Sequence, residues 1–201
     1  GLFCRDLKNF NLAKRVFLNL INKFPSLINP YILLAEILKI ENKYKDAEAV
    51  LRKAIKIDPN HGDLLYNFSL LFFALKNFDN ALVYIDKAIK ISINNDIYKL
   101  LKSEIYINKF NIDEAIYILE ELSNNSRIKK DNNKEIRINI LLADAFLKKR
   151  NYEKAEILLL KLIKKYAGFE LAYLNLSIVY NDMNQLSKSI QILKKGINVS
   201  P

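Results

Sequence analysis

Residues able to do acid–base, nucleophilic or metal chemistry are few and scattered along this chain of 201 residues. His61 is the single histidine and follows Pro59-Asn60 between two helical patterns, so we interpret it as a solvated turn residue. Cys4 is the single cysteine, which excludes a disulfide framework and a Cys/His zinc site. The four glycines are too far apart to form a phosphate-binding loop. We therefore predict a protein that is not an enzyme and that uses no cofactor.

The dominant pattern is a periodic small residue. Alanine recurs every 34 residues at Ala13, Ala47, Ala81 and Ala115, and again after 40 residues at Ala155. A large apolar residue follows each alanine by four positions, on the same face of an amphipathic helix. An upstream helix in each copy carries its own small residue, at Ala35, Ser69, Ser103, Ala143 and Ser177. Prolines fall after the second helix, at Pro25, Pro59 and Pro201, where they stop it.

A helix, a polar turn, a second helix and a stop together resemble the unit of the tetratricopeptide repeat family. The resemblance implies an all-α fold, a right-handed superhelical solenoid of antiparallel helix pairs. The expected units are a partial unit at 1–27 followed by units at 28–61, 62–95, 96–129, 136–169 and 170–201. Ser189 replaces the alanine of the last unit, and Lys99 and Lys102 occupy positions that are usually apolar.

We expect residues 1–201 to form one continuous array, cut from a larger protein, because the chain has no initiator methionine and no polar capping helix. Apolar Ile190, Leu193 and Ile197 would then lack a neighbour, which predicts a homo-oligomer formed through the truncated ends. The longer step between Ala115 and Ala155 places an insertion at 130–135. It is a longer loop or a helix extension, and we favour a plain spacer over a contact element.

Composition and charge restrict the kinds of partner and the cellular compartments that we expect for the chain. The net charge of +10 and the pI near 9.5 would attract nucleic acid, but the lysines are spread over many helices, so we do not expect a nucleic-acid partner. The most apolar stretch, 64–75, is interrupted by Asn67 and Ser69 and is too short to span a membrane. The single cysteine fits a reducing compartment and favours the cytoplasm, and it leaves the periplasm and attachment to a membrane open.

In the resembled family, the first helix of each pair lines a concave groove that receives a peptide or a helix. First-helix residues outside the repeat core are therefore candidates for partner contact, and Tyr66, Leu70 and Phe73 show the i, i+4, i+7 spacing of an apolar stripe. We refer to the whole set as the groove candidates: Ile32, Glu36, Tyr66, Asn67, Leu70, Phe73, Leu100, Glu104, Ile107, Ile140, Asp144, Leu147, Leu174, Asn175 and Ile178.

Polar groove candidates suggest the chemistry of the partner. Glu36, Glu104 and Asp144 occupy equivalent turns. They predict a line of acidic residues, the acidic ridge, within an apolar surface, and such a surface fits an amphipathic helix with a basic flank. The alternative is that the apolar candidates pack sideways between units and the acids are merely solvated. Asn67 and Asn175 either hydrogen-bond an extended peptide or are solvated on a helix surface, and the sequence leaves both interpretations open.

These patterns lead to three functional hypotheses. The first is a non-catalytic scaffold that binds a protein, as a peptide or an amphipathic helix, in its concave groove. The second is a substrate-recruiting arm of an enzyme whose catalytic domain lies outside residues 1–201. The third is a self-associating structural spacer. We favour the scaffold, because a wide apolar stripe on a protein surface is typical of a site that a partner covers.

Overall fold

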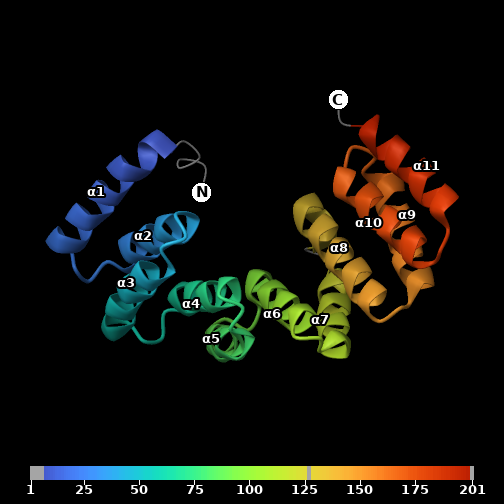
Figure 1. Ribbon diagram of the computed structural model, residues 1–201. Coiled ribbons are helices and arrows are strands. Elements are labelled where there is room, and N and C mark those ends of the chain that lie inside the picture. Colours follow the sequence, from blue (N-terminus) through green and yellow to red (C-terminus); the bar gives the residue numbers. More distant parts are fainter. Residues whose placement is uncertain (1–6, 126–127, 200–201) are drawn as a thin grey trace. The chain divides into compact units, whose positions relative to one another are not determined.

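The computed structural model describes residues 7–125 and 128–199. All regular structure in these residues is helical (Figure 1). The elements are α1 (Leu7–Lys23), α2 (Ile28–Ile40), α3 (Tyr44–Ile57), α4 (Gly62–Ala74), α5 (Phe78–Ile91), α6 (Asp96–Asn108), α7 (Ile112–Asn124), the short 3-10 helix η1 (Ile128–Lys130), α8 (Asn132–Lys148), α9 (Tyr152–Lys165), α10 (Glu170–Asp182) and α11 (Leu186–Ile197). No helix of the described part has the length and apolar character needed to cross a membrane.

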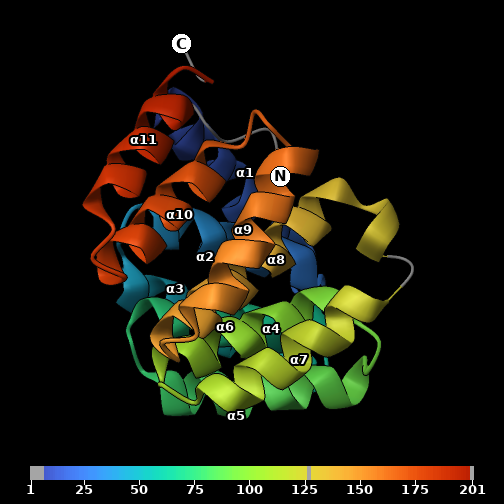
Figure 2. The same cartoon turned by 90° about the vertical axis from the view of Figure 1, so that its right-hand side faces the viewer.

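Consecutive helices pack as hairpins, as the repeat pattern predicts. The pairs α2 with α3, α4 with α5, α8 with α9, and α10 with α11 are in contact, and Figure 2 shows α4 and α5 side by side from a second direction. The helix boundaries follow the expected units, with α2 beginning at Ile28, α4 at Gly62 and α10 at Glu170. The all-α fold of antiparallel helix pairs is therefore confirmed.

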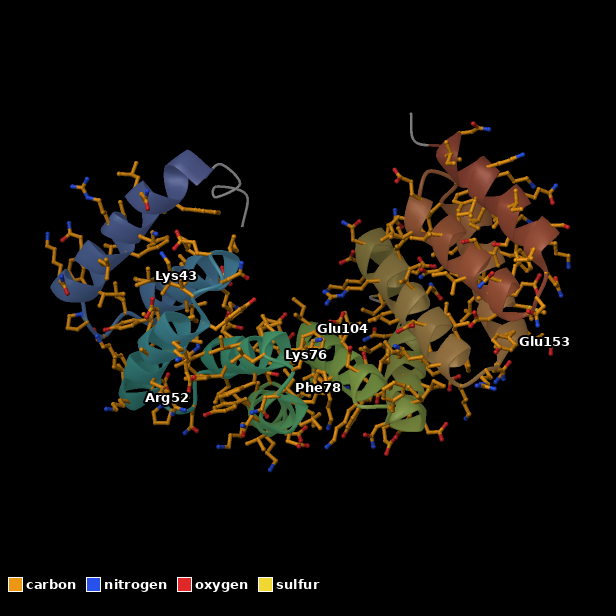
Figure 3. The ribbon with its side chains drawn as sticks, viewed as in Figure 1. Lys43, Arg52, Lys76, Phe78, Glu104 and Glu153 are labelled. Carbon is orange, nitrogen blue, oxygen red and sulfur yellow. The ribbon has the colours of Figure 1, made fainter. Side chains whose placement is uncertain are left out.

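Every first helix from α2 to α10 ends in the same way. The second residue after the helix has a positive φ, between 57° and 62°, at Asn42, Lys76, Phe110, Arg150 and Asn184. At the first of these turns, the next amide donates to a carbonyl five residues back, from Lys43 to Leu38 at 2.8 Å, and the equivalent bond recurs in the other four. This is the Schellman arrangement, which satisfies the free carbonyls at a helix C-terminus. Lys76 in Figure 3 marks one of these turns.

The periodic small residues lie where the two helices of a pair cross. Ala47, Ala81, Ala115 and Ala155 are fully buried, and so are their first-helix counterparts Ala35, Ser69 and Ser103. In the α4–α5 pair, the Ser69 hydroxyl donates a hydrogen bond of 2.8 Å to the backbone carbonyl of Ala81. The last pair has the reverse bond, because Ser189 replaces the alanine of the second helix and its hydroxyl donates to the Ser177 carbonyl at 2.9 Å.

The contacts divide the chain into two compact units, unit 1 at 1–105 and unit 2 at 106–201, and the division falls within α6. Unit 1 has a core around Phe68, which stacks on Phe72 and Tyr84. The core of unit 2 includes Leu119, Ile138 and Leu176. The prediction of one continuous array stays a prediction, and each unit is described here by itself.

The insertion at 130–135 contains the last residue of the short helix η1 and the first residues of α8. Asp131 caps α8 by accepting a hydrogen bond from the Lys134 amide at 3.2 Å. The added turn of α8 then binds the end of α9: Tyr166 donates to the Asn132 side chain at 3.0 Å, and Lys165 pairs with Glu135 at 2.6 Å. The insertion thus contributes contacts between α8 and α9. Residues 126 and 127, which precede it, lie outside the described part.

His61 has a structural role at the start of α4. It occupies the N-cap, and its Nδ1 accepts a hydrogen bond from the Leu64 amide at 3.4 Å. This contact satisfies one of the free backbone amides at the start of α4. The partial unit at 1–27 is described from Leu7 onward, and Cys4 lies outside the described residues.

Gly196 permits the close approach of α11 to α10. A methyl group at this position would place its carbon 2.9 Å from the Cβ of Tyr173, an atom fixed to the backbone of α10. We predict that Gly196→Ala lowers the free energy of unfolding by about 1–3 kcal/mol, as overpacking does. Urea denaturation measures the loss.

Gly168→Ala is the matched control, because nothing lies within 4 Å of the carbon it would add. We expect this control to leave stability within about 0.5 kcal/mol of the unsubstituted chain. A gain of stability in Gly196→Ala, from the better helix propensity of alanine, would contradict the packing argument.

Candidate functional site

In unit 1, the first helices α2 and α4 carry an internal polar network. Asn67 is only 4% exposed. Its side-chain nitrogen donates to the Asp63 carbonyl at 2.9 Å, and its oxygen accepts from Lys39 at 3.2 Å. Burial lowers the pKa of Lys39, and the exposed carboxylate of Glu36 opposes that shift. The amide of Asn67 is therefore occupied at both ends by groups of the chain itself.

A tyrosine from α6 continues this network. The Tyr98 hydroxyl donates a 2.6 Å hydrogen bond to the Asp63 carboxylate, and its ring stacks on Tyr66 with centroids 5.2 Å apart. Burial, followed by the bond to Asp63, raises the pKa of Tyr98. Glu104, half-buried on the same helix, is labelled in Figure 3.

The apolar candidates of unit 1 are largely committed to packing. Tyr66, Leu70 and Phe73 are half-buried against the core, and the Phe73 ring also contacts Phe78, labelled in Figure 3, with centroids 5.9 Å apart. Ile32 and Leu100 are buried. The open apolar surface that these residues offer is therefore small.

Unit 2 has a different arrangement, with a cavity between its first helices. The α8–α10 cavity has a volume of about 210 Å³. Five groove candidates line it, namely Ile140, Asp144, Leu147, Asn175 and Ile178. Leu141, Ala143, Leu159 and Val179 complete the lining. The cavity thus brings together residues that are up to 38 positions apart in the sequence, from Ile140 to Ile178.

The rim of the α8–α10 cavity carries both apolar and polar groups that are accessible. Ile178, which lines the cavity, is 41% exposed, and Leu174, one turn earlier on α10 and outside the lining, is 47% exposed. The side-chain amide of Asn175 makes no hydrogen bond to another residue in the described part of the chain. Asp144 pairs with Lys148 at 3.6 Å. Ile107, the remaining candidate of unit 2, is buried.

The predicted acidic ridge carries cations beside two of its acids. Lys39 lies one helical turn after Glu36, and Lys148 lies one turn after Asp144. The accessible Asp144–Lys148 pair is weak, so a partner's charged group can replace it. Each of these two acids therefore has a cation one turn away on its own helix.

Sequence reasoning missed Lys39, Asp63 and Tyr98, which build the polar network of unit 1. Lys39 follows Glu36 by three residues and Asp63 precedes Asn67 by four, so helical spacing alone could have found both. The Tyr98 contact joins α6 to α4 across 35 residues, and no local pattern signals it.

Comparison with known proteins identifies the repeats. A tetratricopeptide repeat family profile matches residues 38–105, and a second matches residues 171–201. The chain belongs to the tetratricopeptide repeat family. Tetratricopeptide repeats are protein-interaction modules that are generally non-catalytic, and the chain is a scaffold of this class.

Two solved tetratricopeptide repeat structures share the fold. A protein from Parabacteroides merdae superposes with a TM-score of 0.81 at 16% identity, covering 96% of this chain and 75% of that one. YrrB, described as having an unusual peptide-binding site, gives a TM-score of 0.62 at 18% identity, with 92% of each chain covered. These likenesses show the fold alone.

The chain is also similar to the human protein O-mannosyl-transferase TMTC3. It is 28% identical over 197 residues, which is 94% of this chain. The chain spans about a fifth of the length of that relative, since the match covers 20% of it. The similarity therefore concerns the helical repeats and leaves most of the relative unmatched.

The Tyr98 hydroxyl contributes to stability through its bond to Asp63. We predict that Tyr98→Phe lowers the free energy of unfolding by about 1 kcal/mol, because the ring can still stack on Tyr66 while the hydrogen bond is lost. Urea denaturation followed by circular dichroism measures the change.

Tyr44→Phe removes the same atom from an exposed bond, that of Tyr44 to the Asn42 side chain at 3.0 Å, and serves as the control. We expect no measurable loss for this variant, since water replaces an exposed hydrogen bond. Equal effects of the two substitutions would contradict the role assigned to Tyr98.

Proposed function

We propose that the chain is a non-catalytic scaffold that binds a protein segment in the groove formed by its first helices, with the α8–α10 cavity as the principal contact site. The observation that supports this proposal is the gathering of five groove candidates around one cavity of about 210 Å³. Ligand sites typically combine a mainly apolar lining with a few polar groups that fix orientation, and this cavity has both.

The chemistry of the α8–α10 cavity indicates the segment that fits it. Ile140, Leu147 and Ile178 suit an apolar side chain of the partner. Asn175 has an amide free to bond a backbone group, and Asp144 suits a lysine or arginine beside the apolar side chain. A peptide or an amphipathic helix with a basic flank satisfies all three requirements.

An arginine at Ile178 should close the cavity without disturbing the core. We predict that Ile178→Arg weakens binding of peptides selected on the folded chain by at least about tenfold, because a charge replaces apolar contact surface. Peptide display would supply these ligands, and fluorescence anisotropy would give their affinities.

Leu160→Arg is the matched control: Leu160 on α9 is 43% exposed, against 41% for Ile178, and does not line the cavity. Circular dichroism establishes that both variants are folded. Equal affinity for both variants would exclude the α8–α10 cavity as the binding site. Failure to select any peptide would favour the self-associating spacer.

A second candidate function is a substrate-recruiting arm of an enzyme. The similarity to TMTC3, whose name is that of a transferase, favours this candidate. On this hypothesis the scaffold still binds a protein, but the bound protein is then modified by a catalytic domain elsewhere in the same polypeptide. The two candidates differ in the fate of the bound protein.

The arm hypothesis predicts a modified partner. When the native full-length protein carries Ile178→Arg, the partner should lose at least about nine tenths of its modification, in line with the tenfold loss of binding. Mass spectrometry of the partner measures the modified fraction. Loss of binding with unchanged modification would rule out the arm and leave the scaffold.

A further inference from the structure

Phe110 occupies a position that the fold does not explain. It is the residue with positive φ in the turn between α6 and α7, at 62°. The four equivalent turns carry Asn42, Lys76, Arg150 and Asn184. Bulky side chains adopt this conformation at a cost, whereas asparagine tolerates it. Phenylalanine, like Lys76 and Arg150, therefore adopts this conformation at a cost, and it is the apolar residue among the five turns.

The ring of Phe110 also gains nothing from burial. Phe110 is 77% exposed, the largest exposed fraction among the large hydrophobic residues in the described part of the chain. A side chain that is both strained and exposed contributes little to the fold. Backbone strain that is kept despite its cost is characteristic of functional positions.

One cation of the next hairpin lies over the ring, and two more follow it in the sequence. The Lys148 ammonium lies 5.9 Å from the ring centroid, and Lys149 pairs with Asp113 beside the same turn. Arg150, the next residue, is exposed and forms no ion pair within the described residues. Asp144 pairs with Lys148 at 3.6 Å. The two carboxylates are thus matched by lysines, and the Arg150 guanidinium is left over.

We propose that Phe110, Lys148 and Arg150 form a second interaction surface, at the turn edge of unit 2, for an acidic protein segment. An apolar side chain of the segment covers the Phe110 ring, and a neighbouring carboxylate binds the Arg150 guanidinium, whose planar donors suit a carboxylate. None of these residues lines the α8–α10 cavity, although Lys148 pairs with Asp144 of its lining, so the surface is a site beside the one in the proposed function.

The test uses the whole chain and a short labelled peptide in which glutamate alternates with leucine and phenylalanine. We expect Phe110→Asn to weaken peptide binding about tenfold, as loss of an aromatic contact residue does. The same variant should melt no lower than the unsubstituted chain, because asparagine suits the left-handed turn. Fluorescence anisotropy and thermal denaturation give the two readings.

The chain supplies a matched control for charge. Arg150→Asn and Lys76→Asn each remove one cation at the same position of a turn, with φ of 60° and 57°. We expect only Arg150→Asn to weaken binding, by about threefold to tenfold, the range of a contact with a charge. Ile178→Arg should leave binding of this peptide unchanged, which separates this proposal from the α8–α10 cavity.

Four results would overturn the proposal. They are the absence of binding, equal affinity for a peptide with lysine in place of each glutamate, retention of full affinity by Phe110→Asn, and tighter binding of an oligothymidylate than of the acidic peptide. The last result would assign the surface to single-stranded nucleic acid, which stacks on exposed aromatic rings.

Discussion

Close approach of the two helices in each pair is the constraint on which the rest of the structure depends. The crossing residues are alanine or serine, and Ala81 and Ser69 have no exposed surface at all. At such a crossing a side chain of one helix reaches the backbone of the other, as the 2.8 Å bond from the Ser69 hydroxyl to the Ala81 carbonyl shows. A larger side chain would push the helices apart and shift every other contact of the pair. The register of each first helix, and with it the α8–α10 cavity, follows from this approach.

The turn at the C-terminus of each first helix tolerates more variation in its side chain than the helix crossing does. The fold requires a positive φ and the Schellman hydrogen bonds there, but the side chain points to solvent and is free to vary. Asn42 and Lys76 show two of the permitted choices. The repeat thus provides a series of exposed positions whose chemistry can be changed without altering the core. At Phe110 this exposed position carries an aromatic side chain, which adopts the positive φ at an energetic cost.

The sequence predicted the fold well because its signals are local. The 34-residue period, the small residues and the polar turns each lie within one hairpin, so Ala47 and Ala81 could be placed at helix crossings without a structure. The side-chain network was not predictable in the same way. A period identifies which residues are equivalent, but the contact of Tyr98 with Asp63 joins different copies and depends on their particular side chains. The groove candidates were equivalent by position, but the exposed fraction of the apolar ones ranges from 2% for Ile107 to 47% for Leu174.

This difference in exposure among equivalent positions determines where a partner would gain most binding free energy. In unit 1, a ligand approaching Asn67 must first displace Lys39, and it would leave a half-buried ammonium without its acceptor. At the corresponding position of unit 2, the Asn175 amide has no partner to lose among the described residues, and the apolar rim beside it is already exposed. Binding there adds a hydrogen bond and removes apolar surface from water without breaking an internal contact. The same repeat position is therefore closed in one unit and open in the other, because one side chain, Lys39, completes the network.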